Sequence, residues 1–166
     1  MPALYLMRHG QAEPASGGPD ADRPLTLEGM RNVIDSAAGL LEMGVSFDSV
    51  LCSPLERAVQ TARALAGAMN LAATPHLLDT LRPGAVAQAV LAAVQRRLGA
   101  NTLLVGHMPD MSYLAGFLAT GQVAGAVAFA PGAMACIDFA ATPRPGAGAI
   151  GWVMSAEQLI RQSFPT

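Results

Sequence analysis

Three segments of the sequence place arginine or histidine directly after a short apolar run. They are residues 6–10 (Leu-Met-Arg-His-Gly), 51–57 (Leu-Cys-Ser-Pro-Leu-Glu-Arg) and 104–109 (Leu-Val-Gly-His-Met-Pro). If each run is a strand of one open α/β sheet, the polar residues that follow meet at the carboxyl edge of that sheet. Guanidinium groups and helix N-termini hold phosphoryl oxygens, and an imidazole can attack phosphorus. The pattern therefore predicts a phosphate site built from Arg8, His9, Arg57 and His107.

A thiolate is a second nucleophile that this pattern suggests, because Cys52 and Arg57 flank a short loop. That chemistry needs about five residues between the two, so that successive backbone amides can wrap the phosphate. Here four residues intervene, and one of them is Pro54, which has no amide proton. We therefore interpret Cys52 as the buried end of a strand.

Composition narrows the possible functions. A chain of 166 residues with 52% hydrophobic and 13% charged residues suits one domain, 1–166, with a single core. All ten basic residues are arginines, which excludes a P-loop lysine and a Schiff-base lysine. The net charge of −2 argues against nucleic acid as a partner.

We expect a cytoplasmic protein with no membrane partner. The first apolar run is short and is interrupted by Arg8, so it does not resemble a secretion signal. The weakly charged stretch 123–141 contains glycine, proline and an aspartate, and it alternates like strands rather than like a membrane span. The two cysteines, Cys52 and Cys136, form no metal-binding or disulfide pattern.

The order of apolar runs and helix signals predicts strands that alternate with helices. Strands are expected at 4–7, 47–52, 102–105, 134–139 and 150–154, with a loop over 11–25 and either a short strand or an extended connection over 76–78. Helices are expected from Thr26 to Gly44, from a capping box at Ser53–Glu56 to about Met69, from Val86 to Leu98, and from Met108 to about Gly121. This alternation predicts a three-layer α/β/α sandwich with a mostly parallel central sheet.

The three segments also resemble a known family. Arg8-His9-Gly10 after a first strand resembles the signature of the histidine phosphatase superfamily. Residues 53–62 (Ser-Pro-Leu-Glu-Arg-Ala-Val-Gln-Thr-Ala) resemble its second block, and Gly106-His107 resembles its third. Residues 23–26 and 152–155 are similar to the small phosphohistidine phosphatases of that superfamily. The resemblance implies a phosphoglycerate mutase-like fold.

The same resemblance implies a role for each residue of the phosphate site. His9 attacks phosphorus and becomes a phosphohistidine, which water then hydrolyses. It must be neutral, with its other ring nitrogen donating to the backbone. Arg8 and Arg57 hold the phosphoryl oxygens, and a protonated His107 adds positive charge. The protein supplies all of these cations, so we expect no metal and no cofactor.

The general acid has no clear candidate. Many relatives carry a glutamate after the second block, where this chain has Leu78-Asp79-Thr80. Asp79 is a possible acid, although Thr80 stands at the expected position. An alkoxide leaving group needs a proton, whereas a phosphohistidine releases imidazole, which is a better leaving group. The missing acid therefore favours a P–N bond as the substrate.

Three interpretations of the function remain open. The first is a phosphatase for phosphohistidine on a protein, with a histidine-containing phosphotransfer domain as the partner that the resemblance implies. The second is a phosphomonoesterase that acts on a small phosphorylated metabolite with the same His9. The third is a module that binds phosphorylated ligands without turnover.

Arg23 is interpreted as a loop anchor, with contact to the substrate phosphate as a minor alternative.

Overall fold

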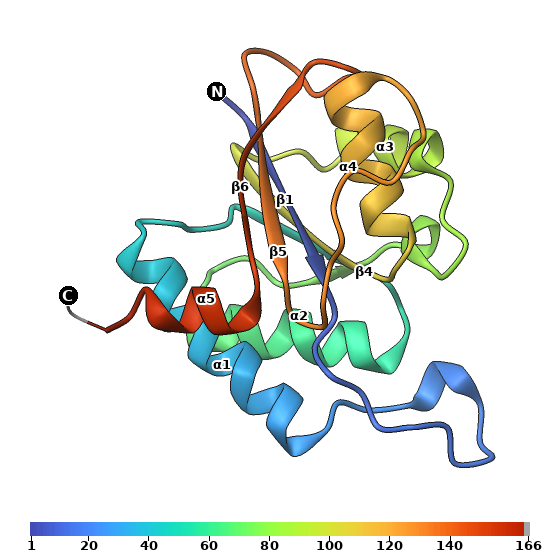
Figure 1. The fold of residues 1–166 in the computed structure, drawn as a ribbon, viewed down its shortest axis with the longest axis vertical. Helices are drawn as coiled ribbons and strands as arrows, with labels where there is room; N and C mark the ends of the chain where they lie inside the picture. Colours follow the sequence, from blue (N-terminus) through green and yellow to red (C-terminus); the bar gives the residue numbers. More distant parts are fainter. Residues whose placement is uncertain (165–166) are drawn as a thin grey trace.

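In the computed structural model, which describes residues 1–164, a six-stranded sheet runs through the molecule in the order β3-β2-β4-β1-β5-β6 (Figure 1). The strands are β1 (Ala3–Arg8), β2 (Ser49–Cys52), β3 (His76–Leu77), β4 (Asn101–Gly106), β5 (Met134–Phe139) and β6 (Gly148–Met154). The helices are α1 (Leu27–Glu42), α2 (Glu56–Ala68), α3 (Ala87–Gln95), α4 (Asp110–Thr120) and α5 (Ala156–Arg161), with 3₁₀ turns η1 (Asp20–Asp22) and η2 (Asp79–Leu81).

The sheet is mostly parallel, as the sequence predicts. β1, β2, β3 and β4 pair in parallel, while β5 is antiparallel to both of its neighbours, β1 and β6. β4 comes late in the chain but lies between β1 and β2. The carboxyl ends of β1, β4 and β2 are therefore adjacent, which is the arrangement that places ligand sites in open α/β sheets.

Helices cover both faces of the sheet, which makes the three layers (Figure 1). Tyr5 and Met7 of β1 belong to a buried cluster that includes residues of α1, α2 and α5. Leu4 and Leu6 belong to a second cluster with α3 and α4. Because successive side chains of a strand point to opposite faces, an unbroken apolar run is what a strand covered on both faces needs.

The first long helix begins and ends as predicted, but the second does not. The Thr26 hydroxyl accepts a hydrogen bond from the Gly29 amide at 2.9 Å, and Gly44 follows α1 with a φ of 72°. The capping box at Ser53–Glu56 is wrong, because α2 begins at Glu56 and its N-cap, Leu55, makes no side-chain cap. The Ser53 hydroxyl instead lies 2.8 Å from a ring nitrogen of His107.

Other element boundaries also differ from expectation. β2 begins at Ser49 rather than at residue 47, and α3 ends at Gln95 rather than at residue 98. Helix α5 was not expected, although Ser155 and Gln158 form a complete capping box at its start. No helix within residues 1–164 is both long enough and apolar enough to cross a membrane.

Candidate active site

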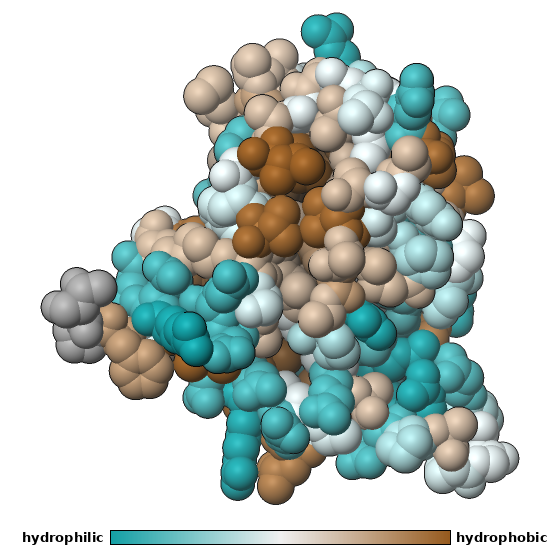
Figure 2. Space-filling model, viewed as in Figure 1, coloured by the Kyte–Doolittle hydropathy of each residue, from teal (hydrophilic) through white to brown (hydrophobic). Residues whose placement is uncertain are grey.

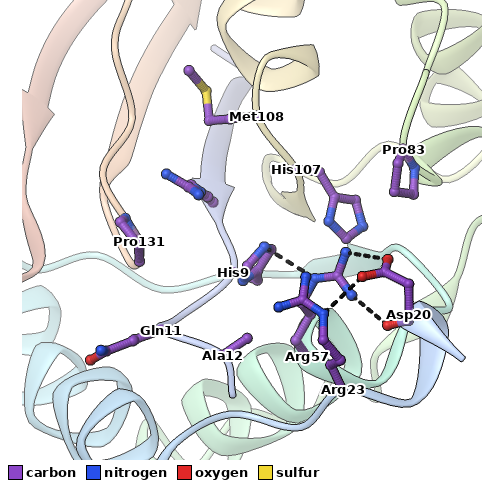
Figure 3. Close-up of a pocket in the computed structure, with 11 residues that line it drawn as sticks. His9, Gln11, Ala12, Asp20, Arg23, Arg57, Pro83, His107, Met108 and Pro131 are labelled. Atoms are coloured by element: carbon purple, nitrogen blue, oxygen red, sulfur yellow. Dashed lines mark hydrogen bonds and ion pairs between the residues drawn. The ribbon is translucent and has the colours of Figure 1, made fainter. Parts of the chain in front are cut away.

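One cavity of about 420 Å³ opens where β1, β4 and β2 end (Figure 3). The structure brings all four predicted residues, Arg8, His9, Arg57 and His107, into its lining. The complete lining is Arg8, His9, Gln11, Ala12, Asp20, Arg23, Arg57, Pro83, His107, Met108 and Pro131. Three arginines and one carboxylate make this a cationic cavity, which suits a phosphoryl group.

His9 follows β1 and is held as a neutral imidazole. Its Nδ1 lies 2.7 Å from the Gly10 carbonyl oxygen, and its Nε2 lies 3.3 Å from Nε of Arg57. Burial lowers the pKa of His9 to about 4, and the charges of Arg57 and Arg8 act in the same direction. A neutral ring must donate from Nδ1 to that carbonyl, so Nε2 is unprotonated and its electron pair accepts the hydrogen bond from Nε of Arg57. This is the tautomer that nucleophilic attack requires.

Arg57 and Arg8 approach the cavity from different elements. Arg57 lies in the first turn of α2, where its Nη1 and Nη2 donate to the backbone carbonyl and the carboxylate of Asp20 at 2.9 and 3.1 Å. Arg8 ends β1, and its Nη1 donates to the Phe129 carbonyl at 3.0 Å. Nε of Arg8 is buried and has no partner within the described residues. The free donor of Arg8 leaves it able to bind an anion.

His107 follows β4, with its ring centroid 5.2 Å from that of His9. Its Nε2 hydrogen-bonds with the Ser53 hydroxyl, and its buried Nδ1 has no partner in the described chain. Burial, together with the nearby His9 and Arg57, lowers the pKa of His107 to about 3. Burial among cations penalises another positive charge. His107 is therefore neutral in the free site at neutral pH, and the protonated form that the sequence predicts for the transition state stays a prediction.

The loop before α1 contributes Arg23, as expected, and also Asp20, which sequence reasoning missed. Nε of Arg23 donates to the Asp20 carboxylate at 2.8 Å, and its Nη1 donates to the Glu13 carbonyl. The dashed lines in Figure 3 show Asp20 between Arg23 and Arg57. The proline- and glycine-rich composition of this loop predicted no structure, so the position of Asp20 carried no local signal.

Asp79, the candidate general acid, does not line the cavity. Its side chain is 85% exposed and pairs with Arg82 at 3.1 Å on the same turn. The neighbouring Thr80 hydroxyl is buried without a partner in residues 1–164. The structure therefore does not bring Asp79 to the nucleophile, because η2 turns its side chain toward solvent.

Several supporting contacts hold these residues in place. The Thr61 hydroxyl accepts from the Gly10 amide at 3.0 Å and donates to the Arg57 carbonyl at 2.7 Å, so it links the end of β1 to α2. The buried Asp110 carboxylate accepts from the Gly84 amide at 2.9 Å, next to the cavity residue Pro83. In the sequence Thr61 stands out only as part of the family motif, and no local pattern indicates which backbone groups its hydroxyl satisfies.

The structure does not support thiol chemistry at this site. Cys52 is fully buried at the end of β2, and burial raises the pKa of its thiol to about 11. A thiol rather than a thiolate is a poor nucleophile. Within residues 1–164, no cluster of three or more His, Cys, Asp or Glu side chains could hold a metal ion.

Comparisons with known proteins assign the family. A model of the histidine phosphatase superfamily (branch 1) matches residues 4–83. An uncharacterised Picosynechococcus protein is 40% identical over 123 residues, which are 72% of this chain and 74% of that protein. Together with the two histidines and two arginines at one sheet edge, these matches show that the chain belongs to the histidine phosphatase superfamily.

Within that superfamily the chain resembles the SixA proteins. It superposes on the protein histidine phosphatase SixA complexed with tungstate with a TM-score of 0.82, 28% identity, and coverage of 95% of this chain and 99% of that one. A putative phosphohistidine phosphatase SixA from Nakamurella superposes with a TM-score of 0.72 and 26% identity, over 92% of this chain and 95% of that one. An Escherichia coli adenosylcobalamin/alpha-ribazole phosphatase is 48% identical over 65 residues, only 36% of this chain and 30% of that protein.

Proposed function

We propose that this protein is a phosphatase that forms a phosphohistidine on His9 and that its substrate is phosphohistidine on a protein. The observation that carries the proposal is the neutral His9, whose Nε2 electron pair is held beside Arg57 in a cationic cavity. We propose a reducing cytoplasmic location as well, with which the two buried cysteines, free thiols in this structure, are compatible.

In the first step, Nε2 of His9 forms a bond to phosphorus while the bond to the leaving group breaks, and the leaving group takes the electron pair. In the second step, water attacks phosphorus, the N–P bond breaks, and orthophosphate leaves with the oxygen of that water. Arg8 and Arg57 hold the phosphoryl oxygens through both steps. A bound dianion next to His107 favours its protonated form, so His107 takes up a proton when the phosphate enters.

The cavity supports a P–N substrate because none of its described lining residues is a protonated carboxylic acid. Asp79 lies outside the lining, and hydrogen bonds from Arg23 and Arg57 hold the pKa of Asp20 below its usual value. A carboxylate cannot protonate an alkoxide leaving group at neutral pH. Imidazole is a weaker base than an alkoxide, so it leaves more easily without such an acid.

A second candidate is a phosphomonoesterase for a small metabolite. The segment that is 48% identical to the adenosylcobalamin/alpha-ribazole phosphatase favours it. The partner then is a small phosphorylated molecule instead of a phosphotransfer domain. A module that binds phosphorylated ligands without turnover is the third alternative, and any catalytic turnover excludes it.

The test compares kcat/KM on a phosphohistidine-bearing protein with kcat/KM on a panel of phosphomonoesters. We expect a preference for phosphohistidine of about a hundredfold or more, the factor that a general acid usually contributes. Asp79→Asn is the control, and it should leave both values unchanged because Asp79 is exposed and outside the cavity. Preference for a monoester, abolished by Asp79→Asn, would contradict the proposal.

A further inference from the structure

Arg57 has no free nitrogen in this structure. Its Nε donates to His9, its Nη1 to the Asp20 carbonyl, and its Nη2 to the Asp20 carboxylate. The proposed function assigns this same guanidinium to the phosphoryl oxygens. Each Nη carries a second hydrogen, so Asp20 holds one of the two donors on Nη1 and one of the two on Nη2, and a phosphoryl group that binds this edge of Arg57 competes with Asp20 for it.

Asp20 is placed where it can give up these donors. It begins η1, a three-residue turn that contains no buried residue, and its side chain is 61% exposed while that of Arg57 is 5% exposed. The loop from Glu13 to Asp22 is exposed throughout. Movement of Asp20 thus disturbs no apolar packing, whereas movement of Arg57 would open the buried start of α2.

The charge of Asp20 suits a counter-ion rather than an acid. Asp20 is the one carboxylate that lines the cavity within the described chain, and it faces Arg57 and Arg23. Both arginines donate hydrogen bonds that keep the carboxylate ionised at neutral pH. An ionised carboxylate accepts the same bidentate contacts from arginine that a phosphoryl group accepts.

We propose that Asp20 is a specificity-determining counter-ion that competes with the phosphoryl group for Arg57 and so limits how tightly the site holds phosphate. A ligand displaces Asp20 only if its own oxygens bind Arg57 more strongly. Terminal phosphoryl groups, which carry close to two negative charges, meet this condition better than phosphodiesters, which carry one. After hydrolysis, return of the carboxylate to Arg57 helps to expel orthophosphate.

The role of Asp20 in the reaction rests on the proposed function, but its effect on phosphate affinity is tested by binding alone. Isothermal titration of orthophosphate into the protein at about pH 8, where the ligand is a dianion, gives Kd without turnover. We expect Asp20→Asn to tighten orthophosphate binding by about tenfold, because a neutral amide competes less well for a guanidinium. Tungstate, titrated in the same way, should show the same order of change.

Asp22→Asn is the matched control. Asp22 lies on the same exposed turn, outside the cavity lining, so the substitution changes the net charge equally without touching Arg57. We expect its Kd to stay within about twofold of the wild type, because exposed charges are screened. Equal Kd values for the two variants would overturn the proposal in favour of a general field effect. Weaker binding in Asp20→Asn would also overturn it, since Asp20 would then be positioning Arg57 for the ligand. Thermal melts confirm that both variants are folded.

Discussion

Two neutral imidazoles, those of His9 and His107, lie among three arginines in the candidate active site. Burial and the neighbouring positive charges lower both pKa values, to about 4 and about 3. The free site thus carries its positive charge on arginine alone. The nucleophile keeps its electron pair at neutral pH, while His107 is available to take up a proton when a dianion arrives.

These two histidines should make the stability of the fold sensitive to acid. Unfolded histidine takes up a proton near pH 6.5, but the folded His9 resists it until about pH 4 and His107 until about pH 3. Between these values the unfolded state binds more protons, so the free energy of unfolding falls as the pH is lowered. We expect His9→Gln combined with His107→Gln to reduce this fall by about 5 kcal/mol between pH 6.5 and pH 4, roughly half from each histidine.

Urea denaturation at a series of pH values measures this effect. His76→Gln is the control, because His76 is exposed on β3 and should leave the pH slope unchanged. An unaltered slope in the double variant would show that His9 and His107 are not held neutral by the fold.

At the scale of elements, the packing of α5 on α1 depends on a single glycine. A Cβ at Gly39 of α1 would overlap the carbonyl oxygen of Leu159 in α5, and Leu159 is fully buried. We expect Gly39→Ala to lower the free energy of unfolding by about 1–3 kcal/mol, the usual cost of overpacking a close contact.

Gly67→Ala is the matched substitution on another helix. Gly67 is an exposed residue of α2, and a Cβ there would meet no atom within 4 Å. Alanine favours the helix over glycine, so we expect this variant to gain up to about 1 kcal/mol. Chemical denaturation measures the free energy of unfolding of both variants. Equal changes in the two would contradict the close packing of α1 against α5.

The sequence predicted the elements well where one short pattern determines them. Leu4–Met7 is a short apolar run of the kind typical of a strand buried on both faces, and Thr26 and Gly44 carry the local chemistry of helix ends. The predicted capping box at Ser53 was wrong because the Ser53 hydroxyl hydrogen-bonds with His107, 54 residues away, and no local pattern reveals that partner.

The residues of the candidate site also fall into two groups, those that local sequence patterns predict and those that they do not. His9 and its neighbours follow strand ends, so alternation of strands and helices was enough to bring them together. Asp20 and the orientation of Asp79 depend on how irregular segments turn, which residue types alone do not determine. The neutral state of His107 depends on burial by distant segments, which becomes visible only in three dimensions.

For the molecule as a whole, a net charge of −2 coexists with a cationic cavity. The positive charge is therefore local. On the face that Figure 2 shows, hydrophilic residues are densest in the lower part and the most apolar residues gather in the upper part, around β6. The exposed Ile150 and Val153 belong to that edge strand. Both buried clusters share one sheet, so we propose that the chain is one domain organised around a single phosphate site.

Trapping the phosphoenzyme tests the central claim most directly. The protein is mixed with a phosphohistidine-bearing substrate labelled in its phosphoryl group, quenched in alkali to preserve phosphohistidine, and analysed by peptide mass spectrometry. We predict label on His9 of the wild type and none on His9→Ala, with His76→Ala labelled as fully as the wild type. Label on another residue, or hydrolysis that survives in His9→Ala, would contradict nucleophilic attack by His9.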